Sequence, residues 1–442
     1  MTKPADQQPA AVPATATQAG SIHARWAWVE PSVWTERMLT ALEQGVKGGV
    51  WFSLIDKVYA IPTLTAAWIK VRANAGAAGI DAQSVQMFER QADWHLQQLH
   101  EQLRQGTYEP QPVRRVWIDK PGSTEQRPLG IPAVRDRVVQ TALRMTLEPI
   151  WEAQFAEQSY GFRPGRGCKD ALRRVEELLK AGYTWVVDAD LKGYFDSIPH
   201  DQLMADIRRK VADGRVLALL EAYLRAKVMD GLQEWQPERG TPQGAVVSPL
   251  LANLYLDGLD HQMAQAGYQM VRYADDFVIL CRSQADAERA VAQVQQYVAA
   301  RGLTLHPTKT RLLDASQQGG FDFLGYHFER GLRWPRRKSL DKLKDKVREH
   351  TPRTSGRSLP EIIQKLNRTL HGWFQYFKHS HRTTFPGLDS WIRMRLRSIL
   401  RKRAGRRGRG RGLDHHRWPN AYFAGLGLFN LTTAHALACQ SH

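Results

Sequence analysis

The sequence of 442 residues predicts an α+β protein, in which short strands that end at acidic residues are separated by longer amphipathic helices. The clearest strand signal lies at Met270–Arg272 and Phe277–Cys281, two β-favouring runs. Between them, Tyr273-Ala274-Asp275-Asp276 places two adjacent acids at the tip of a predicted hairpin. After Trp334 the sequence becomes basic and helical. We therefore expect a sheet-containing part followed by a helical one.

Composition limits the class of protein. The chain is 43% hydrophobic and long enough for about three domains. Its first 20 residues are rich in Ala, Pro, Thr and Gln, and we expect residues 1–30 to be a disordered tail. No apolar run reaches the ~18 residues of a membrane span, so no membrane partner and a cytoplasmic location are expected. The three cysteines form no C-x-x-C pair, which fits a reducing compartment and offers no zinc site of that type.

The positive charge is concentrated in one block. Residues 333–412 hold 24 Lys/Arg and 5 Asp/Glu, a net charge of +19, whereas the remaining residues hold 38 and 39. Such a block indicates a polyanionic partner. Within it, one predicted helical face carries Leu366, Leu370, Trp373, Phe374 and Phe377. Residues 401–411 combine seven bases with three glycines, which predicts a flexible arm.

The other predicted elements are more conventional. In chain order, we expect helices over 31–105, a strand over 113–118 turning into 127–132, a helix after Asp136, a loop over 158–167, a helix from Cys168, a strand over 185–190, helix over 201–229, a turn over 239–244, a helix over 246–259, a helix around 291–298 and a strand over 321–328.

Acidic residues end two of these strands, at Asp190 and at Asp275-Asp276, 85 residues apart. If the strands are neighbours in one sheet, the carboxylates converge, and we expect no nearby base to neutralise them. Two divalent ions about 4 Å apart would then activate a 3′-hydroxyl and stabilise a leaving pyrophosphate. Mg²⁺ suits this chemistry because it takes few carboxylates and shares phosphates with the substrate. The alternative for the hairpin alone is a solvated turn.

Other residues fit a nucleotide site around these acids. Lys120 and Arg127, on either side of a turn, are candidates for the triphosphate, and the ring of Phe195 would crowd a 2′-hydroxyl. The loop over 158–167 mixes glycines, aromatics and arginines, as surfaces that contact bases and phosphates do. The alternative for that loop is a structural turn before the next helix.

Taken together, the motifs resemble those of group II intron reverse transcriptases, also called maturases, over about residues 50–437. The matching segments are 76–81, Arg127–Pro132, Gln158–Gly165, Asp190–Asp196, Arg239–Gly244, Tyr273–Asp276, His306–Lys309, Phe323–Tyr326 and Leu366–Phe377. The resemblance implies a right-hand polymerase, with fingers and an antiparallel palm sheet followed by an α-helical thumb. The endonuclease cysteines of some relatives are missing, so we expect no target-strand cleavage and priming from an existing DNA end.

The resemblance also implies residue roles. Asp190, Asp275 and the carbonyl of Leu191 would bind two Mg²⁺ ions, with Asp276 in support, whereas Asp188 and Asp196 are closer to structural. Nucleotide contacts are expected from Lys120, Arg127, Phe195, Gln243, Gly244 and Lys309, the last as a late proton donor. Nucleic-acid contacts are expected from Arg163, Arg166, Trp373, Arg401, Lys402, Arg403, Arg406 and Arg407.

The expected domains are an N-terminal extension over 31–105, fingers and palm over 106–332, a thumb over 333–400, and a basic arm with a short DNA-binding-like tail over 401–442. The expected partners are group II intron RNA, an RNA template with a DNA primer, target DNA and dNTPs. Two alternatives stay open: a maturase that only promotes splicing, and a relative recruited to phage defence or CRISPR adaptation.

Overall fold

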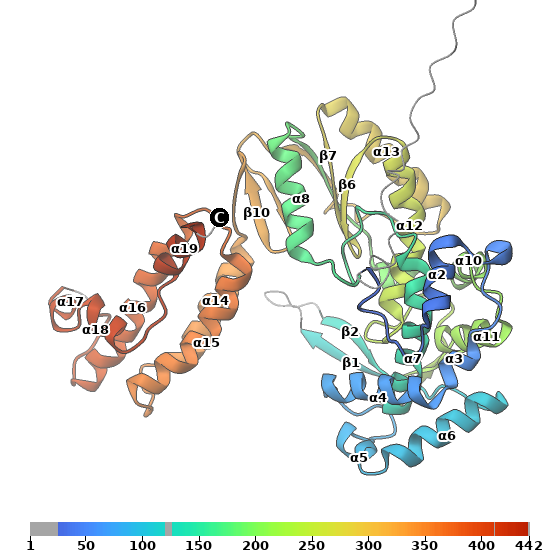
Figure 1. The fold of residues 1–442 in the computed structure, drawn as a ribbon. Coiled ribbons are helices and arrows are strands. Elements are labelled where there is room, and N and C mark those ends of the chain that lie inside the picture. The colour runs from blue at the N-terminus through green and yellow to red at the C-terminus, as the bar shows by residue number, and fades with distance from the viewer. Residues whose placement is uncertain (1–24, 120–125, 411, 441–442) are drawn as a thin grey trace, which may run out of the picture.

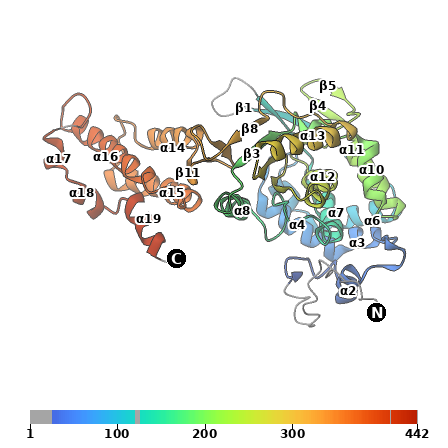
Figure 2. The ribbon, with the colours of Figure 1, turned by 90° about the horizontal axis from the view of Figure 1, so that it is seen from above.

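The computed structural model describes residues 25–119, 126–410 and 412–440. Within them, helices and three sheets form a large body, and a separate helical body extends from it toward the C-terminus (Figure 1). Turning the molecule by 90° shows the same separation (Figure 2). Lys120, Arg411 and most of the predicted tail lie outside the described residues. Among those described, no helix is long and apolar enough to cross a membrane.

The N-terminal part of the large body is helical, as predicted. Its helices are α2 (Glu36–Gln44), α3 (Ile55–Tyr59), α4 (Ile61–Asn74), α5 (Val85–Glu89) and α6 (Ala92–Gln105), with a 3₁₀ turn η1 (Lys47–Gly49). Leu96, Leu99 and Leu103 are buried on one face of α6, and Gly106 ends that helix with φ of 76°. These helices pack around the long helix α7 (Val134–Glu152).

A four-stranded sheet in the order β2-β1-β4-β5 comes next. Its strands are β1 (Val113–Asp119), β2 (Gln126–Ile131), β4 (Val228–Asp230) and β5 (Gln233–Trp235). The predicted hairpin of β1 and β2 is confirmed. The prediction of helix over 201–229 is wrong at its end, because α10 (His200–Arg208) and α11 (Gly214–Leu224) are followed by β4, which pairs with β1 in parallel.

The second sheet, ordered β6-β7-β3-β8, is antiparallel. Its strands are β3 (Trp185–Asp190), β6 (Gln269–Tyr273), β7 (Asp276–Cys281) and β8 (Arg311–Asp314). Alternate side chains explain its two faces. Val187, Ala189, Phe277 and Ile279 share a core with the helices α12 (Ser248–Gln265) and α13 (Gln284–Ala300). Val186, Val271, Val278 and Leu280 pack instead against α8 (Cys168–Lys180).

Residues 321–328 form a hairpin, and the prediction of one strand is wrong. The chain folds as β9 (Phe321–Phe323) and β10 (Tyr326–Glu329), and β11 (Leu332–Pro335) completes the small sheet. The turn residues Leu324 and Gly325 have φ of 45° and 85°. Two consecutive left-handed residues reverse the chain, although the aromatic alternation continues through them.

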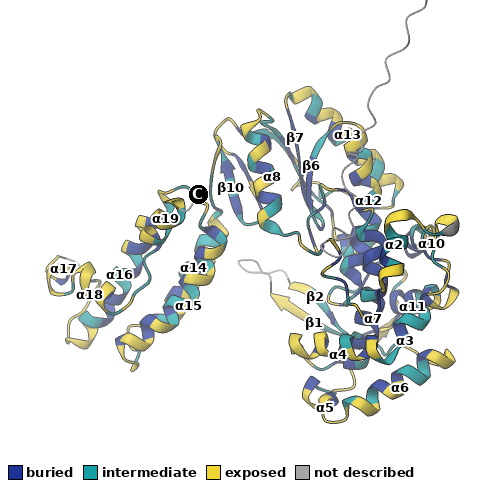
Figure 3. Ribbon diagram, in the orientation of Figure 1, coloured by how far each residue is buried: buried dark blue, intermediate teal, exposed yellow. Residues whose placement is uncertain are grey.

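The C-terminal body has its own core, as Figure 3 shows by the buried faces of its helices. Its helices are α14 (Arg337–His350), α15 (Leu359–Phe377), α16 (Thr384–Arg403), α17 (Asp414–Arg417), α18 (Asn420–Gly425) and α19 (Leu431–Gln440). Leu366, Leu370 and Phe374 are buried as the helical face predicted. Phe377 joins the core formed by α8 and the β9–β10 hairpin, so α15 connects the two bodies.

The described part of the basic arm is docked, and the prediction of a flexible arm is wrong for it. Helix α16 continues through Arg403, past the expected boundary at 400. Arg401 donates to the buried Asp414 at 2.7 Å and to the carbonyl of Arg407 at 2.7 Å. The backbone N–H of Gly410 donates to Ser398 Oγ at 3.2 Å. The acid that anchors the segment follows it in the chain, which composition alone does not reveal.

Candidate active site

Three carboxylates meet where strands β3 and β7 lie side by side. The register pairs Asp190 with Asp276, and Tyr273 pairs with Asp276 across the β6–β7 hairpin. Ala274, with φ of 60°, and Asp275 form the tight turn between the two strands. The convergence that the strand ends predicted is therefore confirmed in geometry.

Burial and neighbouring acids raise the pKa of Asp275 and of Asp276. Burial, then the charge of Asp190, raise the pKa of Asp275 above its usual range. Burial, then the charges of Asp188, Asp275 and Asp190, raise the pKa of Asp276 to about 7. Both shifts mean that the ionised acids lack sufficient compensation from the protein alone, and a bound cation would supply it.

One base does reach the cluster, contrary to the expectation from the sequence. Lys309 Nζ lies 2.5 Å from Asp190 Oδ2. The two residues are 119 positions apart. The segment after α13 brings them together, because His306 donates its backbone N–H to the carbonyl of Asp190 at 2.7 Å and Leu305 forms a β-bridge with Leu191.

The donor set fits a metal that needs few protein ligands. Among the described residues, no group of three or more His, Cys, Asp or Glu is arranged as a ready-made metal site. Mg²⁺ is commonly held by one or two carboxylates together with water and substrate phosphates. Asp190 and Asp275 can provide those carboxylates. The ammonium group of Lys309 already forms an ion pair with Asp190.

Of the predicted nucleotide residues, Arg127 lies near the acids, and the turn that carries Gln243 and Gly244 packs against its strand. Arg127 lies on β2, and its charge lowers the pKa of Asp275, opposing the effect of burial. Gly130 on the same strand donates its N–H to the carbonyl of Gln243 at 2.6 Å. A Cβ on Gly244 would lie 2.4 Å from the carbonyl oxygen of Gly130, so the turn over 239–244 rests directly on β2. Lys120 lies outside the described residues.

Phe195 borders the same turn. Its carbonyl accepts the backbone N–H of Thr241 at 2.6 Å, and its half-buried ring packs edge-on against Tyr194 with centroids 5.6 Å apart. Next to it, Gln243 donates to Asp196 Oδ2 at 3.4 Å. The core therefore supports the ring of Phe195. Hydrogen bonds join Phe195 and Asp196 to the turn over 239–244.

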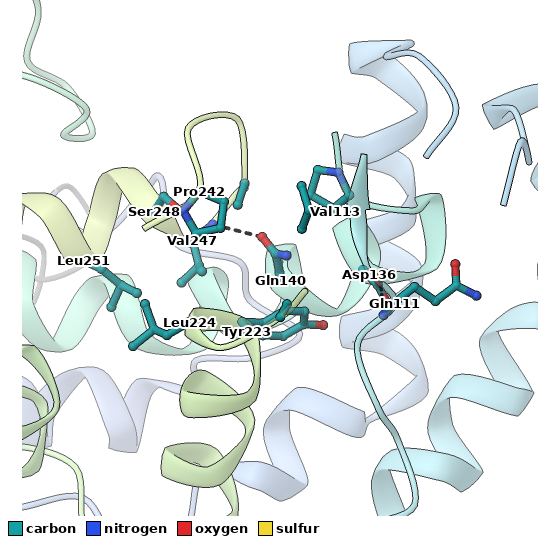
Figure 4. Close-up of a pocket in the computed structure, with 13 residues that line it drawn as sticks. Gln111, Val113, Asp136, Gln140, Tyr223, Leu224, Pro242, Val247, Ser248 and Leu251 are labelled. Carbon is teal, nitrogen blue, oxygen red and sulfur yellow. Dashed lines mark hydrogen bonds between the residues drawn. The ribbon is translucent and has the colours of Figure 1, made fainter. Parts of the chain in front are cut away.

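Two buried polar residues of α7 that the sequence did not single out accept hydrogen bonds from neighbouring segments. Gln140 accepts the backbone N–H of Val246 at 2.8 Å and that of Val247 at 3.5 Å, and Figure 4 shows the second of these bonds. Asp136 accepts a hydrogen bond from the Tyr108 hydroxyl at 2.5 Å, and burial raises its pKa to about 6. The sequence contained a signal for their burial. The two residues lie four positions apart, on the helical face that carries the apolar residues.

Arg163, predicted to contact nucleic acid, is a structural residue, so that prediction is wrong. Its side chain is buried and donates to Glu152 at 2.7 Å and to the carbonyls of Ala156 at 2.6 Å and Ser159 at 2.9 Å. Arg166 is half-buried and donates to the carbonyl of Glu157 at 2.5 Å. The alternative interpretation of this loop, a structural turn, is therefore correct for Arg163.

Trp373 lines a groove between the two bodies. Asp276 and the turn residues Leu324 and Gly325 form one side of this groove, and α14 and α15 form the other. Three bases line it: Arg336, Lys342 and Lys346. The indole N–H of Trp373 has no protein acceptor among the described residues. Of the arm residues expected to bind nucleic acid, Lys402, Arg403, Arg406 and Arg407 are exposed, and Arg401 is engaged by Asp414.

Known families match both bodies. The model described as reverse transcriptase (RNA-dependent DNA polymerase) matches residues 118–328, and the maturase-specific domain of group II introns matches residues 340–418. Protein YkfC of Escherichia coli is 33% identical over 345 residues, which cover 70% of this chain and 86% of that protein. Group II intron-encoded protein LtrA of Lactococcus lactis is 42% identical over 170 residues, which cover 38% of this chain and only 28% of that protein.

Solved structures add little to these matches. A Cas6-RT-Cas1–Cas2 complex aligns with a TM-score of 0.37 and 25% identity, over 56% of this chain and 41% of that one. So low a score does not support a functional argument.

The matched domain and the fold define a right-hand RNA-directed DNA polymerase, with an antiparallel palm sheet and a helical C-terminal region. The chain belongs to the group II intron-encoded reverse transcriptases that carry a maturase domain. Membership implies dependence on a divalent metal and binding of intron RNA and of a template with its primer.

Proposed function

We propose that this reverse transcriptase binds its group II intron RNA, promotes splicing and copies the intron into DNA during retrohoming, by two-metal nucleotidyl transfer with Mg²⁺. The observation that carries the proposal is the meeting of Asp190, Asp275 and Asp276 at adjoining strand ends. Buried acids with raised pKa values are typical of a functional site that binds cations.

Asp190, Asp275 and the carbonyl of Leu191 would hold the ions. Two Mg²⁺ ions held there would make the primer 3′-hydroxyl a better nucleophile and would neutralise charge on the pyrophosphate. Asp276 supports the pair from the start of β7. Lys309, in contact with Asp190, is placed to give a proton to the leaving group.

The residues around the acids select and orient the nucleotide. Arg127 and Lys120 bind the triphosphate, Phe195 excludes the 2′-hydroxyl of ribonucleotides, and Gln243-Gly244 lies near the templating pair. The support for this assignment is the hydrogen bond that joins β2, which carries Arg127, to the turn that carries Gln243.

Each part of the chain has its own role in polymerisation or in nucleic-acid binding. Residues 31–105 form the N-terminal extension, residues 106–332 the fingers and palm, residues 333–400 the thumb, and residues 401–442 a basic end that contacts intron RNA and target DNA. The charge map supports this division, since residues 333–412 carry a net charge of +19. Arg166, Trp373, Lys402, Arg403, Arg406 and Arg407 are the proposed nucleic-acid contacts.

The first prediction tests the acids. Asp190→Ala and Asp275→Ala are each expected to abolish Mg²⁺-dependent primer extension, because the remaining acid cannot hold both ions. Both variants should fold and keep the wild-type RNA affinity. Asp188→Asn is the matched control, since Asp188 lies on the same strand but is paired with Arg311 at 2.7 Å, and it should keep most of the activity.

Substantial extension by either alanine variant would contradict the assigned site. The intron partner is tested separately by purifying the protein from cells and sequencing the bound RNA. Recovery of RNAs other than a group II intron would overturn the intron part of the proposal while leaving the polymerase part intact.

A further inference from the structure

Arg272 is a fully buried arginine immediately before Tyr273 of the catalytic hairpin. A buried guanidinium is costly unless its donors are satisfied. Here Nε donates to Asp260 Oδ1 at 2.8 Å, and Nη2 donates to Asp260 and to Ser159 Oγ, the latter at 2.8 Å. Nη1 donates to Asn253 Oδ1 at 3.1 Å and to the carbonyl of Ala274 at 2.9 Å. All five N–H groups therefore have acceptors.

The hydrogen bond from Arg272 is accepted by a residue with an unusual backbone conformation. Ala274 has φ of 60°, a left-handed conformation that residues with a Cβ rarely adopt. It is the turn residue directly before Asp275, so its peptide orientation determines where both acids of the hairpin point. The Arg272 side chain reaches across the turn and holds the carbonyl of that residue.

The loop over 158–161 also contacts the turn. A Cβ on Gly161 would lie 2.4 Å from the backbone N of Ala274, so this loop touches the turn. Asn253 donates to the carbonyl of Gly161 at 2.7 Å and also accepts from Arg272. The same network of hydrogen bonds thus fixes the loop, helix α12 and the turn against one another.

The contribution of Arg272 is geometric because its charge is already balanced. Asp260 forms a buried ion pair with it inside the core. The charges that act most on the pKa of Asp275 come from Asp190, Arg127 and Lys309. Arg272 therefore does not serve as a counter-ion for the acids.

We infer that Arg272 is a positioning residue of the polymerase site: by bonding the Ala274 carbonyl and anchoring it to α12 and Ser159, its guanidinium holds Asp275 and Asp276 in the orientation that nucleotidyl transfer requires. The inference rests on the proposed assignment of these acids.

The decisive variant is Arg272→Lys. Lysine keeps the positive charge beside Asp260, but its single ammonium cannot reach Asn253, Ser159 and the Ala274 carbonyl together. We expect kcat for single-nucleotide extension to fall by about tenfold to a hundredfold, as for a site misplaced by a fraction of an ångström. The KM for dNTP and the affinity for template–primer should stay within about twofold, because the groups that bind them are elsewhere.

A second readout does not depend on activity. Hydrogen–deuterium exchange of the metal-free protein should become faster for the peptide over 272–277, while exchange of helix α12 stays as in the wild type. Arg301→Lys is the matched control: Arg301 pairs with Asp206 and packs over the ring of Tyr255 at 4.1 Å. It should lower the melting temperature without changing kcat or the exchange of the hairpin.

Wild-type kcat and unchanged hairpin exchange in Arg272→Lys would overturn the inference, as would an equal loss of kcat in Arg301→Lys. If Arg272→Lys does not fold, Ser159→Ala decides, since it removes one anchor of the guanidinium: a lower kcat at unchanged KM supports the inference, and a wild-type kcat overturns it. Asp275→Ala in the same assay separates the two proposals, because extension by that variant would refute the site itself.

Discussion

Asp276 shows how one residue couples the site to pH. Its pKa in the folded protein is raised to about 7 by burial and by the neighbouring acids. A carboxyl group with a raised folded pKa favours the folded state when it is protonated. Its stabilising effect is therefore greatest at low pH and is lost as the pH rises toward 7, where the buried group must ionise.

The prediction is that Asp276→Asn stabilises the metal-free protein at pH 8, by about 1–2 kcal/mol, because the amide removes a buried charge. The gain should shrink toward pH 5, where the wild-type carboxyl group is already protonated. Thermal melting of both proteins across this range, in EDTA, measures the difference. Added Mg²⁺ should reduce the advantage at pH 8, and an advantage that is constant with pH would contradict the assigned shift.

Two arginines with similar sequence surroundings differ in what they hold. Arg163 and Arg272 both follow glycine- or aromatic-containing segments, and both are buried on a carboxylate. Arg163 stabilises the end of α7, whereas Arg272 reaches the turn at Ala274. Each arginine is positioned by its carboxylate partner. Glu152 lies 11 positions before Arg163, and Asp260 lies 12 positions before Arg272.

At the scale of an element, α16 and the segment after it form one unit. The Arg401 guanidinium donates to Asp414, whose side chain is almost completely buried. Removing Arg401 would leave the buried charge of Asp414 with less compensation.

We therefore predict that Arg401→Gln lowers the free energy of unfolding by about 1–2 kcal/mol, less than for a fully buried pair because the Arg401 side chain is 27% exposed. Chemical denaturation followed by circular dichroism measures this loss. Lys402→Gln, one residue further along the same helix and exposed, is the control and should cost less than about 0.5 kcal/mol. Equal stability of the two variants would mean that the segment is not docked.

At the scale of the whole molecule, charge and chemistry lie on different bodies. The acids belong to the palm sheet, and most of the excess positive charge belongs to the C-terminal helices. The two bodies are tied at α15, where Tyr376 donates to the carbonyl of Leu324 at 2.7 Å and Tyr326 donates to the carbonyl of Tyr376 at 2.6 Å. The groove lined by Trp373 runs along this joint.

The separation predicts that binding can be weakened without loss of chemistry. Replacing the exposed Lys402, Arg406, Arg407 and Arg409 with Gln should leave the melting temperature nearly unchanged. RNA affinity should fall, and the slope of log affinity against log salt should flatten by about 2–3 units, at roughly 0.7 per phosphate on single strands. Filter binding over a salt series measures this slope, while extension of a preannealed primer at saturating protein should persist.

The control removes four exposed bases outside the basic block: Lys180, Arg209, Arg225 and Arg289. It should change the slope far less. If both sets flatten the slope equally, RNA binding follows overall charge and not the C-terminal body.

The local elements of this protein, and the acids at the ends of β3 and of the β6–β7 hairpin, were determined by the sequence itself. Periodicity and turn residues act over a few positions, so the strand over 185–190, the start of α8 at Cys168 and the end of α6 at Gly106 were predictable. The concentration of positive charge after Trp334 is likewise a property of composition.

Only the tertiary structure decided which charged side chains are buried and with whom they pair. Lys309 reaches Asp190 across 119 positions, Arg272 meets Asp260 inside the core, and Arg401 is held by an acid 13 positions later. An ion pair forms where folding brings two groups together, and its strength depends on the solvent that folding excludes. Those contacts made Arg163 structural, docked the described part of the basic arm, and bonded Arg272 to the turn before Asp275.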